Sequence, residues 1–128
     1  MEIMKPWELF PNYHEELEFE DLKTDGYELE FHLVNANWNV KVHFDRILAF
    51  RLLPQDCYFH KQWWGTLKQG SCYLVENSNF ISDFDRESQG LMQFDGDIVT
   101  WKHYCIITVN GCLDIISKTG ADVNWEKF

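Results

Sequence analysis

The sequence predicts one α+β domain over residues 1–128, built mainly on a single antiparallel, twisted β-sheet of about five to seven strands with one or two short helices. Three observations lead to this fold. The chain has 128 residues, 45% of them hydrophobic, and no Pro- or Gly-rich linker divides it. Several segments alternate apolar and polar residues with a period of two between turn residues. A segment after residue 78 instead has helical spacing behind a capping residue.

Residues 1–26 have a mixed pattern. Acidic residues crowd the stretch from Glu15 to Asp25, and Lys23 is the one base among them. Leu17 and Phe19 punctuate these acids with a period of two, which is typical of an edge strand. A short helix that frays at its ends is an equally good interpretation of this stretch.

The next two segments predict a β-hairpin. Apolar residues alternate with polar ones over residues 27–34 and again over residues 38–44, and Asn35-Ala36-Asn37 lies between them. A two-residue loop at Ala36-Asn37 sets the pairing of the two strands. The expected apolar pairs are Leu33 with Val40, Phe31 with Val42, and Leu29 with Phe44.

The middle of the chain predicts two strands, a loop and a helix. A third strand covers Ile47 to Leu53 and ends at Pro54, and a fourth covers Ser71 to Glu76. An aromatic loop lies between them. Asn77-Ser78 then offers an N-cap for a short helix over residues 79–88, which ends before Gly90.

A second hairpin is expected near the C-terminus. Strands over 98–109 and 112–117 flank Asn110-Gly111, a dipeptide that favours a tight turn with positive φ at both positions. This turn pairs Ile106 with Ile115. Both faces of the hairpin carry apolar residues, so it should lie centrally, with Ile106, Ile107, Ile115 and Ile116 in the core. Residues 122–128 either add an edge strand or lie over the core.

Composition excludes several classes of function. The 21 acids against 11 Lys and Arg give a net charge of −10, which disfavours a nucleic-acid partner. The stretch Met1–Trp7 has no signal-peptide pattern, and no apolar run is long enough to span a membrane. The four cysteines form no C-x-x-C pair, so we expect free thiols and a cytoplasmic protein with no membrane partner and no cofactor.

The aromatic loop over residues 57–64 has two possible roles. Cys57 and His60 have a spacing that a metal could use, but no further ligands complete a site, so no metal is predicted. Trp63 and Trp64 are adjacent and cannot both face the core easily. They either plug an open end of the sheet or form part of a binding surface.

Asp114 and His103 are the candidates for chemistry. Asp114 lies in an apolar strand, opposite Ile107 in the predicted register, and His103 lies on the same face. A buried acid near a histidine is either an acid–base pair or a structural hydrogen-bonding group. No nucleophile or phosphate-binding motif is present, so the chain is not predicted to be an enzyme, and no catalytic residue is assigned.

The acidic residues fall into two groups. Residues 15–30 hold eight acids and one base, and a second group begins in the predicted helix. They are either a solvated face or a surface complementary to a basic partner. The candidate partner-binding residues are Glu15, Glu16, Glu18, Glu20, Asp83, Asp85, Glu87, Trp63 and Trp64.

The order of motifs resembles a family of small bacterial proteins. It runs from the first hairpin through Leu48-Ala49-Phe50-Arg51 to the aromatic and acidic helix, Phe80 to Ser88. His103-Tyr104-Cys105-Ile106-Ile107-Thr108 and Leu113-Asp114-Ile115-Ile116-Ser117 follow. This is similar to immunity proteins of polymorphic and contact-dependent toxin systems.

The resemblance implies a protein that binds a cognate toxin, often a basic nuclease domain, and occludes its active site. It supplies no functional residues that could be carried over. The alternative is a small-ligand-binding or enzymatic domain with a pocket near His103, Asp114 and the loop 57–64.

Overall fold

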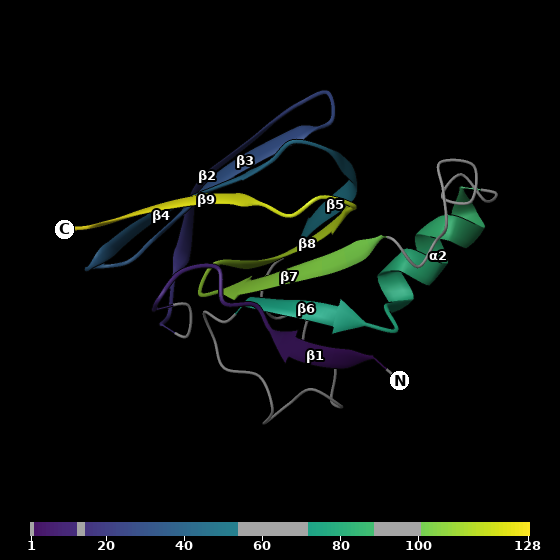
Figure 1. The fold of residues 1–128 in the computed structure, drawn as a ribbon, viewed down its shortest axis with the longest axis horizontal. Helices are drawn as coiled ribbons and strands as arrows, with labels where there is room; N and C mark the ends of the chain where they lie inside the picture. Colours follow the sequence, from purple (N-terminus) through teal and green to yellow (C-terminus); the bar gives the residue numbers. More distant parts are fainter. Residues whose placement is uncertain (1, 13–14, 54–71, 89–100) are drawn as a thin grey trace.

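The computed structural model describes residues 2–12, 15–53, 72–88 and 101–128. Within these ranges, nine strands form two antiparallel sheets that lie against each other, and one helix follows β6 (Figure 1). The predicted antiparallel β architecture with a short helix is therefore confirmed. The single sheet of five to seven strands does not match the structure, which divides its strands between two sheets.

The four-stranded sheet has the order β2-β3-β4-β9. Its strands are β2 (Glu18–Asp25), β3 (Glu28–Val34), β4 (Trp38–Phe44) and β9 (Asp122–Lys127). The acidic segment is thus an edge strand and not a helix, and the C-terminal segment forms the opposite edge. In each case the sequence left two alternatives open, and the structure shows the edge strand.

The register of β3 and β4 is the predicted one, because the signals that set it are local. Asn35 closes the turn: its Oδ1 accepts hydrogen bonds from the backbone N–H groups of Asn37 and Trp38, both at 2.8 Å. Its own N–H donates to the Trp38 carbonyl. The apolar pairs are Leu33 with Val40, Phe31 with Val42, and Leu29 with Phe44.

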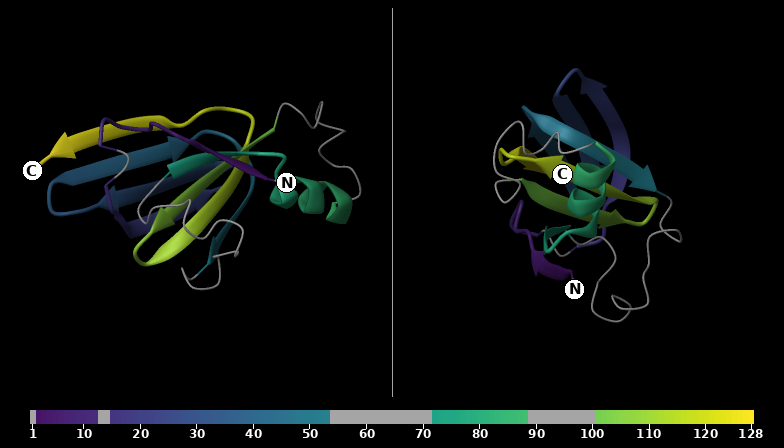
Figure 2. Two further views of the ribbon diagram at one scale, coloured as in Figure 1. Left: turned by 90° about the horizontal axis from the view of Figure 1, so that it is seen from below. Right: turned by 90° about the vertical axis from the view of Figure 1, so that its right-hand side faces the viewer.

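The five-stranded sheet has the order β1-β6-β7-β8-β5, and Figure 2 shows it from two further sides. Its strands are β1 (Ile3–Pro6), β6 (Cys72–Glu76), β7 (Lys102–Thr108), β8 (Gly111–Ser117) and β5 (Ile47–Leu53). The four-residue strand β1 was not predicted, since Ile3–Pro6 shows no clear alternation and forms only by pairing with β6.

The chain passes from one sheet to the other between β4 and β5. Two hydrogen bonds hold this corner: the N–H of Ile47 donates to the Tyr27 carbonyl, and Ser117 Oγ donates to the Arg46 carbonyl. β5 then pairs with β8, far along the chain, and not with β4. The prediction of one sheet failed at this corner, because the sequence there has the spacing of an ordinary turn.

The predicted turn at Asn110-Gly111 is wrong by one residue, and the pairing is wrong by two. The structure turns at Val109-Asn110, so Thr108 pairs with Gly111 and Ile106 pairs with Leu113. Among the described non-glycine residues only Asn77 has a positive φ, and Gly111 does not have one either. A two-residue slip leaves every side chain on its predicted face, so the hydrophobic pattern could not distinguish the two registers.

Tertiary contacts select the observed register. The carboxamide of Asn110 pairs with the backbone of Phe19 in β2: the Phe19 N–H donates to Oδ1 at 2.9 Å, and Nδ2 donates to the Phe19 carbonyl at 3.1 Å. A Cβ atom at Gly111 would lie 3.3 Å from the Leu53 carbonyl oxygen, so the small residue suits its place beside β5.

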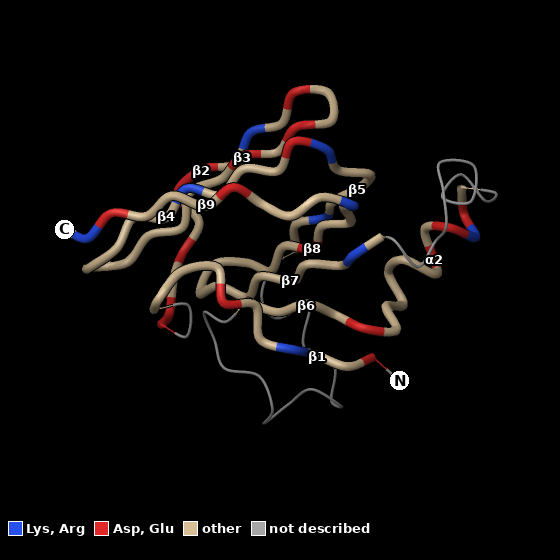
Figure 3. Tube along the Cα trace, in the orientation of Figure 1, with Lys and Arg blue, Asp and Glu red and all other residues tan. Residues whose placement is uncertain are grey.

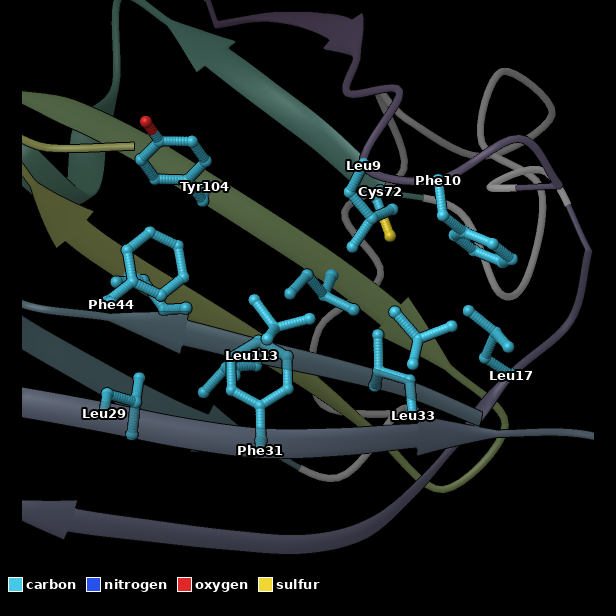
Figure 4. Packing of buried hydrophobic residues seen from close by; sticks show 14 of the residues in the cluster. Leu9, Phe10, Leu17, Leu29, Phe31, Leu33, Phe44, Cys72, Tyr104 and Leu113 are labelled. Atoms are coloured by element: carbon cyan, nitrogen blue, oxygen red, sulfur yellow. The ribbon is translucent and has the colours of Figure 1, made fainter. Parts of the chain in front are cut away.

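The main core fills the space between the two sheets (Figure 4). Phe31 and Phe44 face it from one sheet, and Leu113 and Ile115 face it from the other. The four isoleucines predicted as core are all buried. Ile107 and Ile116 occupy the opposite face of the five-stranded sheet, so that β7 and β8 are covered on both sides, as their pattern predicted.

The helix α2 (Asn79–Glu87) covers one end of that second face. Ser78 is its N-cap, and Ser78 Oγ accepts a hydrogen bond from the N–H of Ile81 at 3.0 Å. Phe80 and Phe84 pack with Ile81 against Trp101 and Ile116. In the described ranges no helix has the length and hydropathy needed to cross a membrane.

Three cysteines, Cys72, Cys105 and Cys112, are buried free thiols, and Cys57 lies outside the described residues. Burial raises the pKa of the Cys72 thiol, and burial together with the charge of Asp114 raises that of Cys112 to about 12. The thiolate is the reactive form. We therefore expect that few thiols of the native protein react with a disulfide reagent within minutes at pH 8.

After unfolding without reductant, the same titration should find all four thiols of the sequence. Two thiols or none would instead demonstrate disulfide bonding.

Candidate functional site

A chain of polar side chains, buried except at its Arg51 end, crosses the face of the five-stranded sheet under α2. Ser78 Oγ lies 2.7 Å from His103 Nδ1, and His103 Nε2 lies 2.5 Å from Asp114 Oδ1. Arg51 Nε donates to Asp114 Oδ2 at 2.9 Å. The side chains of His103 and Asp114 are 1% and 0% exposed, whereas that of Arg51 is 43% exposed.

The sheet register brings these groups together. His103 and Asp114 lie on one face of neighbouring strands, as predicted, but Asp114 pairs with Cys105 and not with Ile107. The corrected register places His103 diagonally next to Asp114. Arg51 of β5 pairs directly with Asp114 on the other side of β8. The sequence therefore predicted the face correctly but overestimated the separation of the two groups.

Phe80 of α2 packs against this polar chain. Its ring makes an edge contact with the ring of His103, with centroids 5.4 Å apart, and the Arg51 guanidinium lies 4.3 Å from its centroid. These contacts keep the imidazole and the guanidinium in place against an apolar surface.

The hydrogen-bond geometry suits a neutral imidazole that carries its proton on Nε2. The guanidinium of Arg51 favours the ionised form of Asp114, and an ionised carboxylate only accepts hydrogen bonds. His103 Nε2 must then be the donor to Asp114. In a neutral ring Nδ1 is left as an acceptor, and the hydroxyl of Ser78 donates to it.

A pocket of about 790 Å³ opens beside Ser78 and His103. Trp101 also lines it, and its indole Nε1 is buried without a hydrogen-bond partner in the described part of the chain. The other lining residues come from the end of β6, from α2 and from the start of β7: Leu74, Val75, Glu76, Asn77, Ile81, Ser82 and Lys102. The predicted aromatic loop 57–64, with Trp63 and Trp64, lies outside the described residues.

The first acidic group lies along and just before the edge strand β2. Glu15 is half-buried and accepts hydrogen bonds from Asn12 and Asn35, so it holds the chain locally. Glu16, Glu18 and Glu20 are exposed. No ion pair joins any of these three to another described residue.

The second acidic group lies on α2 and is far from the first (Figure 3). Asp83 forms an exposed ion pair with Arg86 at 2.9 Å. Asp85 is half-buried, and Glu87 is exposed. The structure therefore does not join the two predicted groups into one surface.

The outer face of the four-stranded sheet is a network of paired charges. Glu30 lies between Lys23 at 3.1 Å and Lys41 at 3.3 Å, and the hydrogen bond from Lys23, aided by Lys41, holds the pKa of Glu30 below its usual value. Asp21 pairs with His32 at 2.7 Å. Glu30 is thus neutralised locally by two lysines, in contrast to Glu16, Glu18 and Glu20.

A corner of this face gathers Glu28, His43 and Asp45, whose ligand atoms lie within 4.8 Å of one another. Glu28 and Asp45 are exposed, and each approaches a different nitrogen of His43. Exposed acidic clusters of this kind are common without a metal ion, so we assign no metal to this one.

Sequence reasoning found His103 and Asp114 but missed their partners. Ser78 was assigned only as a helix cap, and Arg51 only as part of a strand. The available signal was the single base, Arg51, within the apolar strand Ile47–Leu53, since a base in such a strand favours an acid opposite it on the neighbouring strand. No protein-family model, curated protein or solved structure matches this chain.

Proposed function

We propose that the chain is an immunity protein that acts in the bacterial cytoplasm and neutralises a cognate toxin by covering its active site. The observation that carries this proposal is the row of exposed carboxylates at Glu16, Glu18 and Glu20, which pair with no other described residue. The toxin domain would be basic, such as a nuclease, and would present positive charge to this edge.

The position of these acids supports electrostatic recognition. They lie on and just before the edge strand β2, and none of them takes part in the ion pairs that Lys23 and Lys41 form with Glu30. A net charge of −10 adds a long-range attraction for a cationic partner. Such charges act mainly on the association rate and on the choice of partner.

The partner can be captured from the native host with the tagged full chain, identified by mass spectrometry and purified. We then expect the E18K/E20K variant to associate with it about tenfold more slowly than the native chain at low salt, because steering charges are reversed. The difference should shrink at high ionic strength, where these charges are screened. Stopped-flow association rates at two salt concentrations measure both effects.

The matched control is D83K/E87K, which changes the net charge equally at the distant helix α2. Its loss of the exposed pair between Asp83 and Arg86 should matter little for stability. We expect a smaller change in association rate for this variant. An equal decrease in association rate for the two variants would mean that only net charge matters and not the position of the acids. Association rates that are unchanged in both variants would refute electrostatic recognition.

A second candidate function is a small-ligand-binding or enzymatic domain. The pocket beside Ser78 and His103 favours it, because its volume of about 790 Å³ suits a small molecule and its walls combine apolar and polar side chains. A ligand screen by thermal shift, followed by mapping of the bound molecule to this pocket, tests this function independently of any protein partner.

A further inference from the structure

We propose that Ser78, His103 and Asp114 form a catalytic relay that hydrolyses small carboxylic esters bound in the adjacent pocket. This inference rests on the second candidate function, and it adds a nucleophile, a reaction and a substrate class. A serine, a histidine and an aspartate are joined by two hydrogen bonds, of 2.7 and 2.5 Å. Ser78 and His103 both line the pocket.

The direction of the relay follows from its charged end. Arg51 Nε donates to Asp114 Oδ2, Asp114 Oδ1 lies beside His103 Nε2, and Nδ1 lies beside the Ser78 hydroxyl, so a ring with its proton on Nε2 turns its free nitrogen toward Ser78. This is the arrangement of a nucleophile, a general base and an orienting acid. The two ring nitrogens have exchanged the roles that they have in chymotrypsin-type enzymes, which the chemistry of imidazole permits.

The local backbone presents the hydroxyl at a sharp junction. Strand β6 ends at Glu76, Asn77 adopts a φ of 55°, and α2 begins immediately after Ser78. A positive φ at a non-glycine residue is a local strain that is often found at functional sites. The N–H of Ile81 donates to Ser78 Oγ at 3.0 Å and fixes the position of the hydroxyl oxygen.

A second residue of the pocket carries a buried hydrogen-bond donor. The indole N–H of Trp101 is a buried donor that has no hydrogen-bond partner among the described residues, and Trp101 is 5% exposed. A buried unsatisfied donor is costly, and a ligand oxygen would relieve that cost. Trp101 and Ile81 also offer apolar surface for an acyl group.

The reaction proceeds through an acyl-enzyme. Ser78 Oγ attacks the ester carbonyl carbon while its proton passes to His103 Nδ1, and the resulting imidazolium stays paired with Asp114. The carbon–oxygen bond to the alcohol breaks, and His103 returns the proton to the leaving alkoxide. Water then attacks the acyl-enzyme, loses a proton to Nδ1 and releases the acid, after which Ser78 recovers its proton. In the net reaction, one ester and one water molecule are converted into one carboxylic acid and one alcohol.

The test uses the full chain with p-nitrophenyl acetate and p-nitrophenyl butyrate. We expect hydrolysis about 10²–10⁴-fold faster than the S78A variant shows, the range of general-base catalysis. The control S88A removes a serine at the other end of α2 that is not among the pocket-lining residues, and it should keep native rates. A fluorophosphonate probe on the native protein should label Ser78, as peptide mass spectrometry would record.

The labelling experiment does not depend on the folding of any variant. Esters hydrolysed no faster than by S78A, or by free imidazole at equal concentration, would overturn the proposal, and so would the absence of label on Ser78. If a butyrate ester or its acid product raises the melting temperature without turnover, the relay is refuted while ligand binding in the pocket stands.

Discussion

Replacing Arg51 with methionine is expected to lower the free energy of unfolding by about 1–3 kcal/mol, because it removes a charged hydrogen-bond donor from a fully buried carboxylate. The Asp114 carboxylate is fully buried, so in R51M its charge stays in the interior without the guanidinium. Methionine keeps an apolar side chain beside the Phe80 ring, so that the loss reports mainly on charge. Urea unfolding of R51M and the native chain measures the difference.

The double variant R51M/D114N separates charge from packing. The carboxamide that replaces the Asp114 carboxylate would be neutral, and its oxygen could still accept the hydrogen bond from His103 Nε2. We therefore expect the double variant to be more stable than R51M alone, since a neutral group replaces a buried charge that has lost its guanidinium. If R51M lost less than about 0.5 kcal/mol, a surface-like effect, the pair would not be a buried interaction in solution.

Replacing Ile115 with alanine should cost about 2–4 kcal/mol, because the side chain is 0% exposed and lies between the two sheets. The loss combines the removed apolar surface with the cavity left behind. The packing here is dense: the rings of Phe44 and Tyr104 lie 5.1 Å apart nearby in the same core. Thermal or urea unfolding provides the measurement.

The control for this variant is V109A, in the turn of the same hairpin, where the side chain is 42% exposed. It should change stability by less than about 0.5 kcal/mol. A similarly small effect in I115A would mean that Ile115 is not packed between the sheets, and equal effects of both variants would contradict the observed burial.

Local patterns determined much of this fold. The alternation of β3 and β4 and the side-chain hydrogen bonds of Asn35 fix their pairing within a short stretch of chain, which explains why that register was predictable residue by residue. The bounds of β5 and the capped start of α2 depend on equally local signals. The site was predictable only in part: a period of two placed His103 and Asp114 on one face.

Tertiary structure alone decided which strands share a sheet, since β5 pairs with β8 and β9 with β4 through contacts distant in sequence. It also decided the register of β7 and β8, because a slip of two residues keeps every side chain on its face and the bridge from Asn110 to β2 distinguishes the alternatives. Tertiary structure also brought Ser78 to His103, because a helix cap and a strand residue meet only when α2 packs on the sheet.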